Sequence, residues 1–98
     1  MLQFIMDNYG EAIDTAAIAQ SASVSESECL RCFRATIGTT PIRYLREYRI
    51  EQAANRLAIS QASIADIAAE CGFQDTSYFT KTFREMKGVT PKAYQMEH

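Results

Sequence analysis

Glycine, proline, cysteine and histidine are all scarce in this chain of 98 residues. Four glycines and two prolines are too few for a loop-rich β domain, so we expect helices. Three cysteines are an odd count, which argues against a disulfide framework and predicts a reducing compartment, the cytoplasm. The single histidine is His98, and no nucleophile–histidine–acid set can be built around it. Since no glycine-rich phosphate loop is present either, we expect neither an enzyme nor a cofactor.

Long apolar runs are missing as well. The apolar runs extend over only a few residues, which excludes a membrane span and a membrane partner. No basic and apolar segment opens the chain, so we expect no signal peptide. With 47% hydrophobic and 22% charged residues, the chain is nevertheless apolar enough to fold. Its length predicts one domain.

The net charge of −2 argues against nucleic-acid binding, for which a basic balance is usual. The charges are unevenly distributed, however. Residues 1–29 hold five acids and no base, whereas residues 30–60 hold six arginines and two glutamates. Because binding depends on the local patch, a role in nucleic-acid binding stays open. The acidic first segment supports an alternative, a protein-interaction module.

Apolar periodicity and capping residues predict an all-α fold of seven helices. Ser25 followed by Glu28 is a capping box, and Thr40-Pro41 supplies the N-cap and first residue of a long helix. The predicted helices cover residues 2–9, a segment from 14 or 15, 25–37, 40–59, 63–71, 75–87 and a short segment from 90. The predicted inward-facing residues are Leu2, Ile5, Met6 and Tyr9 in the first helix, Leu45, Ile50, Ala53, Ala54 and Leu57 in the fourth, and Phe79, Phe83 and Met86 in the sixth.

The sequence repeats itself at an offset of 50 residues. Phe33-Arg34 returns as Phe83-Arg84, and Thr40-Pro41 returns as Thr90-Pro91. Upstream the offset is 49, as in Ile18-Ala19 and Ile67-Ala68, which predicts one extra residue in the second turn. Two generic helical hairpins that agree by chance are the alternative. The matches include helix ends as well as apolar positions, so we favour a true repeat.

Each repeat has the spacing of a helix-turn-helix unit. In the first copy, Ala19 is small enough for a close helix crossing and Ser23 lies in the turn. Gly72 takes the turn position of the second copy, where a positive φ is often needed. We therefore predict helix-turn-helix subdomains at 1–39 and 61–98, joined by a linker helix at 40–60. Such a unit can place its second helix in the DNA major groove.

The second helix of each unit is predicted to expose hydroxyl and basic side chains. Short hydroxyls near the helix N-terminus and a base one turn later suit contacts with base edges. A solvated helix face with scattered charge is the alternative. The exposed residues are Glu26, Ser27, Leu30, Arg31 and Arg34 in the first copy, and Thr76, Ser77, Tyr78, Thr80, Lys81 and Arg84 in the second.

The pair Cys29-x-x-Cys32 also permits a zinc or redox hypothesis. Zinc needs four ligands, and only Cys71 and His98 remain. A redox motif needs a βαβ context, which this sequence lacks. The helix-turn-helix spacing already explains both cysteines as small core residues, so we predict no metal site.

The second half of the chain resembles the DNA-binding domain of AraC/XylS-type transcription regulators. The segment IADIAAECGFQDTSYFTKTFREMKGVTP, residues 64–91, is close to the signature of that family. Residues 49–53 and Leu57 are similar to its linker helix, and the first half matches more loosely, so the resemblance covers nearly all 98 residues. It implies a bacterial-type regulator, expected to be an activator, with two helix-turn-helix units in successive major grooves. The linker helix is roughly 27 Å long at about 1.5 Å per residue. Successive grooves lie about 34 Å apart, which is comparable to the reach of this helix together with its flanking residues.

The resemblance implies specific contacts with double-stranded DNA. Contacts with bases are expected from Ser27, Leu30, Arg31, Ser77, Tyr78 and Lys81. Contacts with the DNA backbone are expected from Thr15, Arg34, Ser63, Thr76, Thr80 and Arg84. Leu30 has no hydrogen-bonding group and can offer only an apolar contact, for example with a thymine methyl group. RNA polymerase is a further expected partner, with Asp75 and Glu85 as candidate contacts.

The first helix is predicted to begin at residue 2, with no segment leading into it. We therefore expect the chain to be the C-terminal fragment of a longer regulator. A naturally short, stand-alone activator is the alternative. The resemblance places a ligand-sensing or dimerisation domain ahead of such a fragment.

Overall fold

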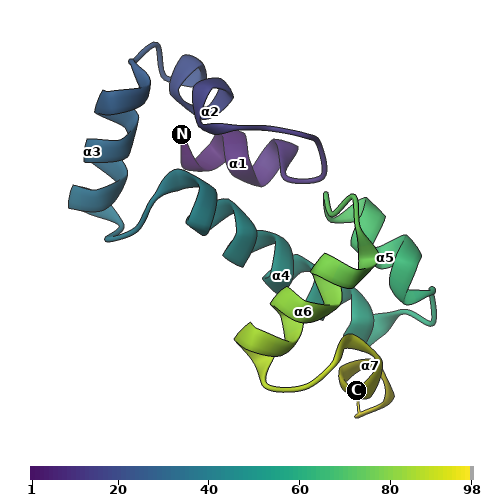
Figure 1. Ribbon diagram of the computed structural model, residues 1–98. Helices are drawn as coiled ribbons and strands as arrows, with labels where there is room; N and C mark the ends of the chain where they lie inside the picture. The colour runs from purple at the N-terminus through teal and green to yellow at the C-terminus, as the bar shows by residue number, and fades with distance from the viewer. Residues whose placement is uncertain (98) are drawn as a thin grey trace. The chain divides into compact units, whose positions relative to one another are not determined.

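A computed structural model describes residues 1–97 and contains seven α-helices within that range (Figure 1). No strand occurs among the described residues. The prediction of an all-α fold with seven helices is thus confirmed, with ends that differ by one or two residues. The helices are α1 (Leu2–Asn8), α2 (Thr15–Ser21), α3 (Glu26–Thr36), α4 (Pro41–Ile59), α5 (Ile64–Glu70), α6 (Thr76–Lys87) and α7 (Pro91–Glu97).

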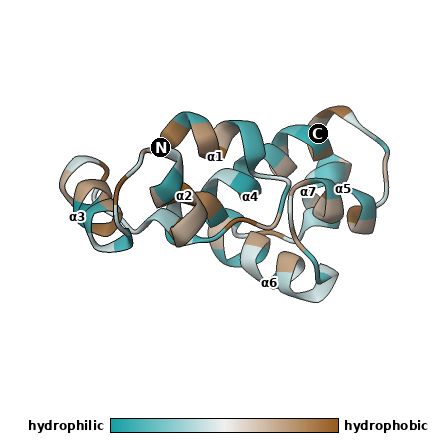
Figure 2. Cartoon of the chain, turned by 90° about the horizontal axis from the view of Figure 1, so that it is seen from above, coloured by the Kyte–Doolittle hydropathy of each residue, from teal (hydrophilic) through white to brown (hydrophobic). Residues whose placement is uncertain are grey.

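The chain forms two compact units, Met1–Tyr48 and the residues from Arg49 onward. The boundary falls inside α4, so this single helix of 19 residues belongs to both units. Every helix carries both hydrophilic and hydrophobic residues (Figure 2), as expected of helices with one buried face. The sequence-based boundaries at residues 39–40 and 60–61 stay a prediction.

Side-chain oxygens cap every helix except α1, at the positions that the sequence indicated. Thr40 Oγ1 accepts the N–H of Arg43 and Thr90 Oγ1 that of Ala93, both at 3.2 Å. Ser25 Oγ accepts the backbone N–H of Glu28 at 3.1 Å, and Ser63 Oγ accepts that of Asp66 at 3.1 Å. Asp14 Oδ1 accepts the N–H of Ala17 at 2.8 Å, and Asp75 Oδ1 accepts that of Ser77 at 2.9 Å. Each contact satisfies one of the free donors at a helix N-terminus. The second helix of both repeats therefore begins at a defined residue.

The turn between the two helices of each repeat has the same hydrogen-bonded geometry in both copies. The N–H of Val24 bonds the carbonyl of Ala19 at 3.1 Å, and the N–H of Phe73 bonds that of Ala68 at 2.9 Å. The residue before each donor has a positive φ, +57° at Ser23 and +93° at Gly72. Both turns are thus Schellman motifs.

The second turn is one residue longer than the first. Four residues separate α2 from α3, whereas five separate α5 from α6. This difference confirms the extra residue that the change of repeat offset predicted.

The core of the first unit joins α1, α2, α3 and the first turns of α4. Its buried residues are Ile5, Ile18, Ala19, Cys29, Phe33 and Leu45. The apolar stripe predicted for α1 is partly wrong, because Leu2 and Met6 are 37% and 44% exposed. Met1 and Phe4 pack against the core instead. Since α1 has only seven residues, its apolar pattern alone does not determine which side faces inward.

The core of the second unit is built around the aromatic rings of α6. Phe79 and Phe83 are fully buried, with ring centroids 5.7 Å apart. Met86, predicted to point inward, is 39% exposed, because it lies in the last turn of a helix whose buried positions end at Phe83. The five predicted apolar residues of α4 are all buried, as expected.

The repeat extends to the contact between each second helix and the helix that follows it. Phe33 meets Tyr44 edge-on at 6.0 Å between ring centroids, and Phe83 meets Tyr94 edge-on at 5.5 Å. Both pairs are related by the offset of 50 residues. The two units therefore share their packing as well as their helix ends.

No helix within residues 1–97 is long and apolar enough to cross a membrane.

Candidate nucleic-acid interface

Helix α3 exposes one polar face opposite its buried residues Cys29 and Phe33. All four predicted DNA contacts of this helix are exposed: Ser27, Leu30, Arg31 and Arg34. Leu30 is 42% exposed, so an apolar group lies between hydroxyl and basic side chains. The Arg31 guanidinium Nη2 lies 3.7 Å from Glu28 Oε1, one helical turn towards the N-terminus. The first unit thus presents a hydroxyl, an apolar group and two arginines on one helix, together with two exposed acids, Glu26 and Glu28, in its first turn.

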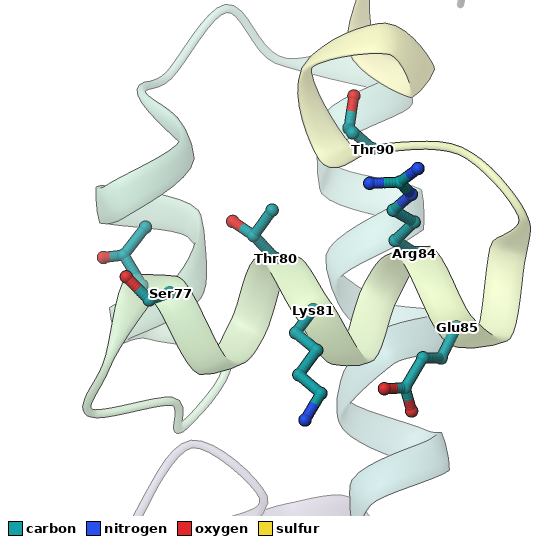
Figure 3. A pocket seen from close by; sticks show the side chains of 7 residues that line it. Ser77, Thr80, Lys81, Arg84, Glu85 and Thr90 are labelled. Carbon is teal, nitrogen blue, oxygen red and sulfur yellow. The ribbon is translucent and has the colours of Figure 1, made fainter.

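Helix α6 borders a surface concavity of about 710 Å³ (Figure 3). Its lining is largely hydroxyl and charged, with two bases and one acid. The residues that line it are Thr76, Ser77, Thr80, Lys81, Arg84, Glu85 and Thr90. Five of these seven are among the predicted DNA contacts. The sixth predicted contact of this helix, Tyr78, is 46% exposed, and its ring lies 6.2 Å from that of Phe73.

The side chains in the concavity point in two directions (Figure 3). Arg84 extends along one edge of α6, towards Thr90 at the start of α7, and Thr80 points to the same edge. Lys81 and Glu85 extend to the opposite edge. A guanidinium beside two hydroxyls is suited to hold a phosphate oxygen. An ammonium on the other edge is suited to contact an acceptor on a base.

Two residues of this concavity were not predicted as DNA contacts. Thr90 was identified only as a helix cap, and its Oγ1 does accept the N–H of Ala93 at 3.2 Å. Its place beside α6 depends on the turn at Gly88, where φ is +80°. Glu85 lies one turn after Lys81 on the same helix, and this spacing could have indicated that the two side chains line the same surface.

The two predicted backbone contacts outside α3 and α6 lie at helix N-termini. Ser63 is the exposed N-cap of α5. Thr15 is the first residue of α2 and is half-buried, directly after the capping Asp14. The Asp14 carboxylate adds negative charge at that helix end, which makes Thr15 the weaker candidate for an anion contact.

The three cysteines are free thiols, and Cys29 and Cys71 are buried. Burial raises the pKa of both buried thiols, which disfavours the thiolate that metals and redox reactions require. Within residues 1–97, no three His, Cys, Asp or Glu residues lie together in a group that could hold a metal ion. Cys29 and Phe33 instead fill the angle beneath α3.

Two helix-turn-helix units with exposed, partly basic second helices define a double helix-turn-helix domain. The helix-turn-helix domain family matches residues 18–97. The transcriptional activator RhaS of Escherichia coli is 33% identical over 92 residues, which are 94% of this chain and 33% of RhaS. The chain belongs to the AraC/XylS-type family of transcription-regulator DNA-binding domains.

Two solved structures show the same fold. An AraC-type transcriptional regulator from Chromobacterium violaceum has a TM-score of 0.92 at 29% identity, over 98% of this chain and 86% of that one. The DNA-binding domain of AdpA, solved in complex with a target DNA, has a TM-score of 0.93 at 28% identity, over 98% and 86% of the two chains. The chain spans about a third of the length of the curated relatives that it matches.

Proposed function

We propose that this chain binds double-stranded DNA at specific sequences, with α3 and α6 in successive major grooves. The observation that carries the proposal is the repeated Schellman turn, which precedes an exposed helix in each unit. Helix α6 presents hydroxyl and basic groups, and α3 presents Ser27, Arg31 and Arg34 beside two acids in its first turn. The likeness to the AdpA domain, which was solved with a target DNA, supports it. The chain then acts by binding rather than by catalysis, as the output part of a transcription regulator.

The side-chain chemistry divides the contacts into two groups. Ser27, Leu30 and Arg31 on α3, and Ser77, Tyr78 and Lys81 on α6, would contact base edges. Arg31 can donate two hydrogen bonds to O6 and N7 of a guanine, whereas Lys81 offers a point charge. The DNA backbone would be held by Arg34 and Arg84, with Thr76, Thr80, Thr15 and Ser63 as hydroxyl donors and Thr90 added from the structure.

The whole regulator would have further partners. We propose contact with RNA polymerase, activation of transcription in the cytoplasm, and dimerisation through a domain that precedes this one. Glu85 is an exposed acid on α6 and is available for a protein contact. Asp75 is exposed too, but its carboxylate already accepts the N–H of Ser77 at 2.9 Å, so Glu85 is the better candidate.

A selection experiment tests sequence-specific binding. The purified chain selects from a random duplex library of about 25 base pairs, at low salt and near 0.15 M salt. We expect two short enriched motifs whose centres are about 10–10.5 base pairs apart, one helical turn. Binding without enrichment, or enrichment of one motif, would contradict the proposal that both units contact bases. Binding should weaken as salt rises, because phosphate contacts release counterions. Absence of binding at any salt concentration would refute DNA binding and favour the protein-interaction module.

Alanine variants separate base contacts from backbone contacts. Arg31→Ala and Lys81→Ala should each cost about 1–3 kcal/mol on the selected duplex and much less on random DNA. Arg84→Ala should weaken binding to both duplexes equally and reduce the salt slope by about one. Equal losses on both duplexes for all three variants would mean that Arg31 and Lys81 touch phosphates only. Fluorescence anisotropy at several salt concentrations measures all of these quantities.

A further inference from the structure

The basic residues on the exposed faces of α3 and α6 differ in their ion pairing. Arg31 lies 3.7 Å from the Glu28 carboxylate. Arg34, Lys81 and Arg84 form no ion pair with any residue in the range 1–97. Arg31 is also the one arginine among the predicted base contacts, and a guanidinium can donate two hydrogen bonds to a guanine. Of these four basic residues, only Arg31, a candidate base contact of the first unit, forms an ion pair within the described residues.

The backbone of Glu28 is held in place independently of Arg31. Its backbone N–H donates to Ser25 Oγ at 3.1 Å, within the cap of α3. The carboxylate lies three residues before Arg31 on the same helix face, a spacing at which opposite charges attract. The position equivalent to Glu28 in the second unit is Tyr78, by the offset of 50 residues. A carboxylate at this place therefore belongs to the first unit alone.

We propose that Glu28 is a specificity-determining residue that restrains Arg31 from contacting phosphates on unrelated DNA. This inference rests on the proposed function. On a random duplex, Arg31 can gain only a charge contact with the phosphate backbone, and the Glu28 carboxylate opposes that contact by pairing with Arg31 and by repelling phosphate. On a guanine, two hydrogen bonds to O6 and N7 outweigh one exposed ion pair. Glu28 thus weakens non-specific binding more than specific binding.

The exposure of the pair determines how large the effect is. The Arg31 and Glu28 side chains are 74% and 51% exposed, so solvent screens their attraction and the pair opens readily. Ion pairs of this kind change an equilibrium by roughly 1.4- to five-fold. Loss of Glu28 should therefore tighten binding to a random duplex by about that factor. Binding to the duplex selected from the random library should change by less than two-fold.

The test compares Glu28→Gln with a matched control, Glu47→Gln. Glu47 forms an exposed pair with Arg43 at 3.3 Å on α4, so both variants remove one negative charge and one exposed ion pair. Affinity is measured for the selected duplex and for a random duplex between about 0.05 and 0.2 M salt. For Glu28→Gln we expect tighter random-duplex binding and a salt slope steeper by about one. For Glu47→Gln we expect the ratio of the two affinities to stay unchanged.

A double variant shows whether the effect passes through Arg31. In an Arg31→Ala background, Glu28→Gln should no longer alter the ratio of the two affinities. Thermal unfolding of each variant serves as a control for a change in the α3 cap. A weaker cap would lower stability but would not by itself alter the ratio of the two affinities. If the wild-type chain has a preferred duplex and Glu28→Gln behaves like Glu47→Gln, the inference is overturned while the proposed function stands. If the wild-type chain prefers no duplex, the proposed function is refuted and the inference with it.

Discussion

The two Schellman turns allow a reciprocal test of the repeat, through Ser23→Gly and Gly72→Ser. Ser23 has φ +57° and Gly72 has φ +93° at equivalent positions of the two units. An L-residue with a side chain pays about 1–2 kcal/mol for the left-handed conformation. Glycine avoids that cost, but it loses more backbone freedom on folding. This entropy loss cancels about 0.5–1 kcal/mol of the advantage of glycine. The difference leaves about 0.5–1 kcal/mol in favour of glycine at both positions.

Ser23→Gly should therefore raise the free energy of unfolding by about 0.5–1 kcal/mol, and Gly72→Ser should lower it by at least that amount. The Ser23 side chain is exposed, so its removal leaves no cavity and the backbone term dominates. Urea denaturation followed by circular dichroism gives the midpoints and slopes. Ala16→Gly serves as a control, because Ala16 is an exposed residue within α2 and glycine there should destabilise the chain by about 0.5–1 kcal/mol. A loss of stability in Ser23→Gly, or a gain in Gly72→Ser, would refute the assignment of equivalent turns.

Two further predictions concern the core. Phe79→Ala should cost about 3–5 kcal/mol, because the ring is fully buried and lies 5.0 Å from that of Phe73; a cost below about 1 kcal/mol in urea denaturation would contradict this packing. Burial raises the pKa of the Cys71 thiol above its ordinary value of 9.0. The unfolded chain then loses this proton at a lower pH than the folded chain, so stability should fall as pH rises above about 9. A Cys71→Ala variant should show a shallower fall, and an identical pH profile would contradict the shift.

The features that depend on a few neighbouring residues could be predicted from the sequence. The caps at Ser25, Ser63 and Asp75 each involve a backbone N–H only two or three residues away. The turn at Gly72 is closed by hydrogen bonds within five residues. Because such contacts need no distant partner, residue type and spacing were sufficient to predict the helices and the two repeats.

Burial was less predictable where a helix is short or where its last turn passes beyond the core. Leu2, Met6 and Met86 fit an apolar stripe in the sequence, yet all three are more than a third exposed. Their exposure depends on where the neighbouring helices lie. An apolar pattern shows that a helix has a buried face, but in seven or twelve residues it does not show where that face ends.

The amino-acid sequence by itself determined the helix ends, the two turns and most of the exposed polar residues on α3 and α6; Thr80, predicted to be exposed, is half-buried. Only the tertiary structure decided which of these residues lie together. It brought Thr90 of the α6–α7 connection to the concavity beside Arg84. The Arg31–Glu28 pair, by contrast, joins residues three apart on one helix and is local. The physical reason is that helix ends are local hydrogen-bonding events, whereas the neighbours of a side chain depend on packing across the fold and on the rotamers that the packing allows.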